Sequence, residues 1–177
     1  LHPQVANRLD EIDRIRIETQ ESAMRIINKT GPLKNAADRD HCLQYITAVA
    51  LLHGELTSDH YEPAAAGDLR IDRLRDQMEV VEQPRYTRDY LDPDLRSIAN
   101  AVQIFFKDGS STDRIEVEYP LGHRRRRIEA LPLLREKLRT NANTRFAVDR
   151  VDELIDRFFD TDQIDSLTVD SFINHFV

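Results

Sequence analysis

Residues 98–119 read IANAVQIFFKDGSSTDRIEVEY. The middle of this stretch, Lys107-Asp108-Gly109-Ser110, is a strong turn signal. The apolar side chains before the turn that share one face are Ile98, Val102, Ile104 and Phe106. After the turn, the apolar residues Ile115, Val117 and Tyr119 alternate with the charged residues Arg114, Glu116 and Glu118. Because successive side chains of a strand point to opposite faces, the stretch predicts a β-hairpin with one solvated face.

The chain before the hairpin predicts one more strand and several helices. Alternation over Asp13–Thr19 is typical of a strand, and Glu21–Asn28 favours a short helix followed by a polar loop over Lys34–Asp38. The segment Asp40–His53 is apolar on nearly all sides when it is drawn as a helix, so we expect it in the core. Gly54 is the residue expected to end that helix.

Helical periodicity also predicts helices over Asp68–Gln77, Ile128–Arg139, Val148–Phe158 and Val169–Phe176. Strands and helices do not alternate as βαβ units, so the fold class is α+β. We expect a small antiparallel or mixed sheet that contains the hairpin and is packed by helices.

Composition limits the classes of protein that the chain can belong to. Its 177 residues suffice for one domain, or one with a small appendage, and no apolar run approaches the roughly 18 residues of a membrane span. The net charge of −7 argues against nucleic acid and anionic membranes as partners. One cysteine excludes an internal disulfide and an iron–sulfur cluster ligated by this chain alone. No signal peptide is recognisable and no Met opens the chain, so we expect a piece of a longer protein.

Two features could carry chemistry. His41 and Tyr45 are four residues apart on the expected core helix, which would place both on one face. They could present a polar pair to a cleft, or they could satisfy each other or a carbonyl in the core. The second feature is the basic block, His123-Arg124-Arg125-Arg126-Arg127. Its guanidinium groups could bind carboxylates of a ligand, or they could form internal salt bridges or a solvated loop.

Metal and cofactor sites are not predicted. Asp89, Asp92 and Asp94 lack the spacing of a calcium loop, and the histidines lack H-E-x-x-H spacing. No glycine-rich phosphate loop is present, and Cys42 lies in an apolar setting typical of a core residue.

Several stretches together resemble the C-terminal part of the MmgE/PrpD family, over about Ile12 to Val177. They are GPL at 31–33, NAADRDHCLQY at 35–45, LHGELT at 52–57, RIDRLR at 70–75, YTRDY at 86–90, RSIANA at 96–101 and EYPLGH at 118–123. The resemblance implies an enzyme that dehydrates 2-methylcitrate to 2-methyl-cis-aconitate in propionate breakdown, without an iron–sulfur cluster or other cofactor. It implies a location in the bacterial cytoplasm, or in the mitochondrial matrix of a eukaryote, and a homodimer.

The resemblance also implies a domain arrangement and site residues. Residues 1–127 would form a small α/β domain and residues 128–177 would return to a larger helical domain that precedes Leu1, unless both form one continuous domain. The family's main acid and base groups would then lie upstream of Leu1. Tyr45 matches the tyrosine of an H-x-x-Q-Y motif, with His41 beside it, as catalytic residues. His123, Arg124, Arg125 and Arg126 match a segment of the methylcitrate branch and would bind the tricarboxylate substrate.

Two alternatives stay open. The parent could be a decarboxylase or dehydratase of another polycarboxylate within the same family. The chain could also be a non-catalytic module for folding or subunit contact.

Overall fold

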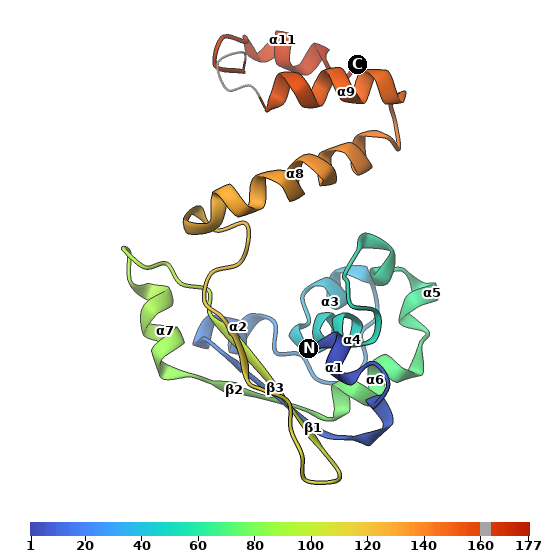
Figure 1. Cartoon of the computed structure of the whole chain (residues 1–177), viewed down its shortest axis with the longest axis vertical. Coiled ribbons are helices and arrows are strands. Elements are labelled where there is room, and N and C mark those ends of the chain that lie inside the picture. Colours follow the sequence, from blue (N-terminus) through green and yellow to red (C-terminus); the bar gives the residue numbers. More distant parts are fainter. Residues whose placement is uncertain (160–163) are drawn as a thin grey trace. The chain divides into compact units, whose positions relative to one another are not determined.

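The computed structural model describes residues 1–159 and 164–177 of the chain. It divides into two compact units, Leu1–Pro120 and Leu121–Val177, which are described separately below (Figure 1).

A four-stranded mixed sheet organises the first unit, with strand order β2-β1-β3-β4. The central strand β1 (Ile12–Thr19) pairs in parallel with β2 (Met78–Glu82) and antiparallel with β3 (Asn100–Phe106). The edge strand β4 (Ile115–Val117) pairs antiparallel with β3. The predicted hairpin, the predicted strand at 13–19 and the α+β class are therefore confirmed, whereas β2 was not predicted.

The core of this unit lies on one face of the sheet. Alternating residues of β1 and β3, among them Ile15, Ile17 and Ile104, are almost completely buried. They form one cluster with the apolar residues of α4 (Leu43–His53) and α6 (Leu69–Asp76), including Val49 and Leu74. Burying a side chain of this size stabilises a fold by about 1.5–3 kcal/mol, so these two helices and the sheet depend on each other.

The helix predicted over Asp40–His53 is present as α4 but begins later, at Leu43, and Asp40 is the last residue of a separate helix, α3. Asn35 caps α3 (Ala36–Asp40) by accepting a hydrogen bond from the backbone N–H of Asp38 at 2.9 Å. His41 leaves helical geometry, and Cys42 is extended, buried and precedes the first residue of α4. The loop predicted over Lys34–Asp38 was therefore wrong, because the capping asparagine starts a helix inside it.

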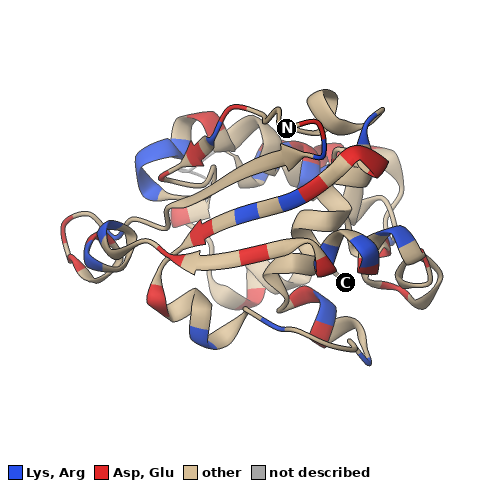
Figure 2. Cartoon of the chain, turned by 90° about the horizontal axis from the view of Figure 1, so that it is seen from below, with Lys and Arg blue, Asp and Glu red and all other residues tan. Residues whose placement is uncertain are grey.

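Short helices and turns complete the first unit. They are α1 (His2–Val5), α2 (Glu21–Ile26), α5 (Pro63–Ala66), α7 (Pro84–Leu91) and the 3₁₀ turns η1 (Leu9–Glu11) and η2 (Ser58–Tyr61). Helix α7, which was not predicted, places the fully buried Tyr86 against Ala99 and Ala101. The second face of the sheet is charged, and Figure 2 shows acidic and basic segments next to each other on its strands.

The second unit begins with η3 (Arg124–Arg126) and continues through α8 (Arg127–Ala142), α9 (Val148–Phe158) and α11 (Val169–Asn174). Its core is small and contains Ala142, Val151 and Ile155. Helix α8 leaves large apolar side chains exposed; they are Ile128, Leu131, Leu133 and Leu134. None of the described helices is long and apolar enough to cross a membrane.

Gly54 ends α4 in the left-handed conformation, with φ of 76°. A Cβ atom at this position would lie 2.8 Å from Cδ2 of His2, whose Nδ1 is hydrogen-bonded to the carbonyl of Leu51 at 2.8 Å. Because Gly54 has no side chain, the end of α4 can pack closely against the ring of His2.

We predict that Gly54→Ala lowers the free energy of unfolding by about 2 kcal/mol or more, measured by urea denaturation. The matched control is Gly109→Ala. Gly109 also has a positive φ, of 85°, but no atom lies within 4 Å of a Cβ added there. The control should lose only about 1 kcal/mol, the cost of a left-handed alanine. If both variants lose the same free energy of unfolding, the His2 contact is unimportant. If the contact matters, the double variant His2→Ala/Gly54→Ala should lose less free energy of unfolding than Gly54→Ala alone.

Candidate functional site

Tyr45 projects from α4 into the core of the first unit and is 2% exposed. Its hydroxyl donates a hydrogen bond to the carbonyl oxygen of His60 at 2.6 Å, and its ring stacks on that of Tyr61. Burial raises the pKa of the Tyr45 hydroxyl above its ordinary value. The hydroxyl is therefore uncharged at neutral pH, and it donates its hydrogen bond to one fixed carbonyl oxygen.

His41 does not share a helix face with Tyr45, so that prediction was wrong. His41 follows the last residue of α3, outside α4, and its side chain is 60% exposed. Its Nδ1 lies 3.2 Å from the carbonyl oxygen of Ala37 and 3.3 Å from a carboxylate oxygen of Asp40. The turn after α3 separates the two residues, and within the described residues their hydrogen bonds go to different partners.

The residues that do surround Tyr45 were not identified from the sequence. Turn η2 covers its hydroxyl, and the buried Arg39 of α3 donates from Nε to the carbonyl oxygen of Tyr61 at 2.7 Å. The backbone N–H of Thr57 donates to Nδ1 of His60 at 3.0 Å, which closes a capping box at the start of the turn. The sequence signal for this turn is the Thr-x-x-His spacing of residues 57–60.

The basic block forms η3 and the start of α8 in the second unit. His123 caps η3, and its Nδ1 accepts a hydrogen bond from the backbone N–H of Arg125 at 3.2 Å. Arg126 forms an ion pair with Glu129 at 2.7 Å, which lowers the pKa of that carboxyl group. Arg124 and Arg125 are exposed. The ion pair of Arg126 therefore fits the alternative of internal salt bridges at that residue, and the exposure of Arg124 and Arg125 places their side chains at the surface.

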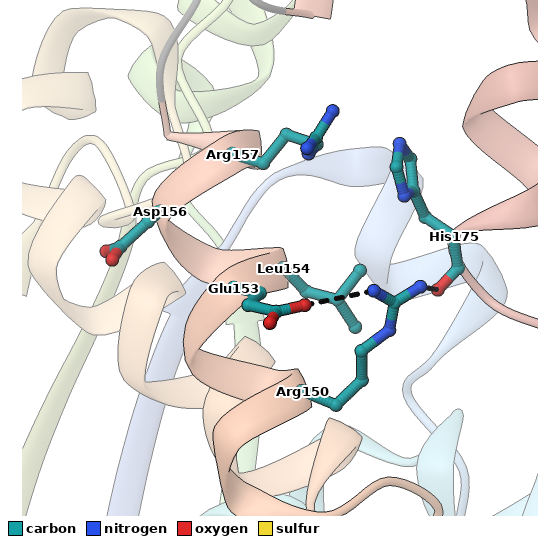
Figure 3. Close-up of a pocket in the computed structure, with 6 residues that line it drawn as sticks. All are labelled: Arg150, Glu153, Leu154, Asp156, Arg157 and His175. Carbon is teal, nitrogen blue, oxygen red and sulfur yellow. Dashed lines mark hydrogen bonds and ion pairs between the residues drawn. The ribbon is translucent and has the colours of Figure 1, made fainter.

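The second unit also contains a hollow of about 280 Å³, which the sequence did not reveal (Figure 3). Its lining residues are Arg150, Glu153, Leu154, Asp156, Arg157 and His175. Arg150 donates to Glu153 and to the carbonyl oxygen of His175, at 3.1 Å each. Asp156 accepts from Arg135 at 2.8 Å. The lining carboxylates are therefore paired with arginines, and the hollow is a mixed-charge surface.

Comparison with known proteins places these features in a family. A model of the MmgE/PrpD C-terminal domain matches residues 1–161. The chain is 46% identical over 168 residues to the mitochondrial 2-methylcitrate dehydratase of Yarrowia lipolytica, covering 95% of this chain and 32% of that protein. It is 48% identical over 164 residues to the 2-methylcitrate dehydratase of Cupriavidus necator, covering 93% of this chain and 34% of that protein.

The enzyme of that name from Escherichia coli K12 is 40% identical over 167 residues, covering 94% of this chain and 35% of that protein. The chain spans about a third of the length of the curated relatives it matches. The family model and these relatives agree with the motifs quoted from the sequence, and the chain belongs to the MmgE/PrpD C-terminal domain family.

Proposed function

We propose that this chain is the C-terminal part of an iron-independent 2-methylcitrate dehydratase, a hydro-lyase. The observation that carries the proposal is identity of 40–48% to three enzymes of that name over at least 93% of this chain. The reaction would remove a proton from the carbon next to a carboxylate and expel the neighbouring hydroxyl as water, leaving a C=C bond.

The chain would supply part of the machinery. Such an elimination needs a base, an acid for the leaving hydroxyl, and cations that hold the carboxylates. We expect the main base upstream of Leu1, in a helical domain that the exposed apolar side chains of α8 would contact. Helices of residues 128–177 would return to that domain, and the enzyme would be a homodimer.

Within this chain, the basic block is our candidate for substrate binding. Guanidinium groups bind carboxylates through paired hydrogen bonds, and the block contains four consecutive arginines. Tyr45 is our candidate proton donor because burial keeps its hydroxyl protonated. The hydroxyl would have to exchange its hydrogen bond to His60 for one to the substrate. His41, which is exposed, would take part only by contacting substrate from outside the core.

A non-catalytic role in folding or subunit contact is the second candidate, favoured by the exposed apolar residues of α8. A related polycarboxylate substrate is the other alternative within the family. One of these relatives comes from the bacterium Cupriavidus necator and another is mitochondrial by name, so we propose the bacterial cytoplasm or the mitochondrial matrix as the location.

The function is tested with the full-length parent enzyme and with the 177-residue chain alone. We expect the parent to convert 2-methylcitrate to the unsaturated product, followed by ultraviolet absorbance, and the isolated chain to show no turnover. A parent that turns over only a different polycarboxylate would establish the alternative within the family. An inactive parent would favour the non-catalytic role, and activity in the isolated chain would place the base inside it.

Substrate binding by the basic block is tested by Arg124→Ala and Arg125→Ala in the parent. Each should raise KM for 2-methylcitrate about tenfold or more, which corresponds to about 1.4 kcal/mol per decade. Arg145→Ala, which removes an exposed arginine elsewhere in the same unit, is the matched control and should leave KM unchanged. Unchanged KM in Arg124→Ala, Arg125→Ala and Arg126→Ala would assign the block a structural role.

The role of Tyr45 is tested by Tyr45→Phe in the parent, with kcat and melting temperature measured on one preparation. A proton donor predicts that kcat falls about a hundredfold while KM changes much less. A structural hydroxyl predicts a lower melting temperature with nearly normal kcat, because the partly buried carbonyl of His60 loses its donor at a cost of about 1 kcal/mol. Tyr61→Phe, which alters the stacked neighbour, should retain kcat and serves as the control.

A further inference from the structure

Arg39 is a buried arginine of the first unit whose positive charge has no carboxylate partner. It lies in α3 and is 6% exposed. Its Nε donates to the carbonyl oxygen of Tyr61 at 2.7 Å. Its two Nη groups form no hydrogen bond or ion pair with any residue that the structure describes. Two of the three nitrogens of a covered guanidinium group are therefore left without an acceptor in the protein.

The carboxylates of the same helix do not balance this charge, because they interact with other cations. Asp38 lies 3.6 Å from Nζ of Lys29. Asp40 lies 3.3 Å from Nδ1 of His41. Removing a charge from water costs free energy unless a partner of opposite charge replaces the water, so buried arginines are normally paired. The unpaired Nη groups of Arg39 therefore point to an anion that the protein binds from outside.

The guanidinium of Arg39 and the hydroxyl of Tyr45 are held by the same turn. The hydroxyl donates to the carbonyl oxygen of His60, and Nε of Arg39 donates to the next carbonyl oxygen along the chain, that of Tyr61. Burial raises the pKa of Tyr45, and the charge of Arg39 acts on the same pKa in the opposite direction. An anion bound by Arg39 would consequently lie next to the phenol group.

We propose that Arg39 binds one carboxylate of the substrate through its two Nη groups, next to the Tyr45 hydroxyl. The proposal rests on the proposed tricarboxylate substrate and names a contact for it inside the first unit. The planar guanidinium group offers two parallel N–H donors, which match the two oxygens of a carboxylate. The hydrogen bond from Nε to Tyr61 fixes the plane of the guanidinium before the substrate arrives.

Arg75 of α6 provides the comparison, because it is as well covered but its charge is balanced. Its side chain is 9% exposed. Its Nη1 donates to Asp72 at 2.6 Å and its Nη2 to the carbonyl oxygen of Gly31 at 2.8 Å. Only its Nε lacks a hydrogen-bond partner among the described residues. Arg75 therefore has no Nη group left for a ligand.

The test measures the Kd of tricarballylate for the full-length parent by titration calorimetry. This tricarboxylate has no hydroxyl group, so it can bind but cannot be dehydrated. Arg39→Gln removes the charge and should raise the Kd of tricarballylate about tenfold or more. Arg75→Gln is the matched control. It should lower the melting temperature, because it breaks the ion pair with Asp72, and leave this Kd within about twofold of the parent.

Two dicarboxylates distinguish a direct contact from general damage to the site. Glutarate lacks the middle carboxylate of tricarballylate, and methylsuccinate lacks a terminal one. The compound that lacks the carboxylate bound by Arg39 should have the same Kd, within about twofold, for the parent and for Arg39→Gln. The other dicarboxylate should bind more weakly to the variant, as tricarballylate does. The pattern would then identify which carboxylate Arg39 contacts.

The outcomes separate this inference from the proposed function. An unchanged Kd of tricarballylate in a folded Arg39→Gln variant would overturn the contact, and so would an equal rise in Kd for all three compounds. If Arg39→Gln does not fold, Arg39→Lys decides instead. It keeps the charge but lacks the paired donors, so an unchanged Kd would overturn the contact and a rise of about threefold would support it.

Two further results concern the parent itself. A parent that needs Arg39 to bind tricarballylate but does not dehydrate 2-methylcitrate would overturn the proposed reaction and leave the carboxylate site in place. If the parent dehydrates 2-methylcitrate without binding tricarballylate, KM replaces Kd, and an unchanged KM in Arg39→Gln would overturn the contact alone. A parent that neither binds tricarballylate nor dehydrates 2-methylcitrate would overturn both.

Discussion

The burial of one face of β1 is the constraint on which the first unit depends. β1 is hydrogen-bonded on both sides, in parallel to β2 and antiparallel to β3, so its register sets the register of the whole sheet. Ile15 and Ile17 enter the core, while Arg16 and Glu18 between and beyond them face the other side. A shift of one residue would exchange these sets and bury the charges, which is far too costly to occur. The alternation that places the isoleucines of β1 in the core therefore also places its charged residues on the opposite face.

The sequence predicted the elements with strong local patterns. The hairpin has alternation and a turn signal, and the strand at 13–19 has alternation over its length, so both are present as expected. β2 was missed because its five residues, two of them charged, show no clear alternation of apolar and polar side chains. Its strand geometry comes from pairing with β1. Helix α7 was missed because most of its residues are polar and its buried contribution is one tyrosine, Tyr86.

The candidate site was predicted less completely, for a physical reason. Residue spacing places His41 and Tyr45 on one helix face only if the helix is continuous, and the backbone at His41 and Cys42 interrupts it. The carbonyl of His60 that receives the Tyr45 hydroxyl comes from a turn fifteen residues away in sequence. Backbone carbonyls carry no sequence signature, so such a partner becomes visible only in three dimensions. The basic block, by contrast, was evident from composition, and family membership agrees with the motifs that flank it.

The position of β1 in the sheet has a consequence for synthesis of the protein. As the chain leaves the ribosome, β1 emerges first, but its parallel neighbour β2 ends at Glu82 and its antiparallel neighbour β3 ends at Phe106. The central strand therefore exists without either partner until most of the first unit has been made. Contacts between residues so distant in sequence are slow to form, and unpaired apolar strands are exposed to other chains during that time. Arg14 and Arg16 alternate with the buried isoleucines. Their charges oppose association of the unpaired strand β1 with a second copy of the chain.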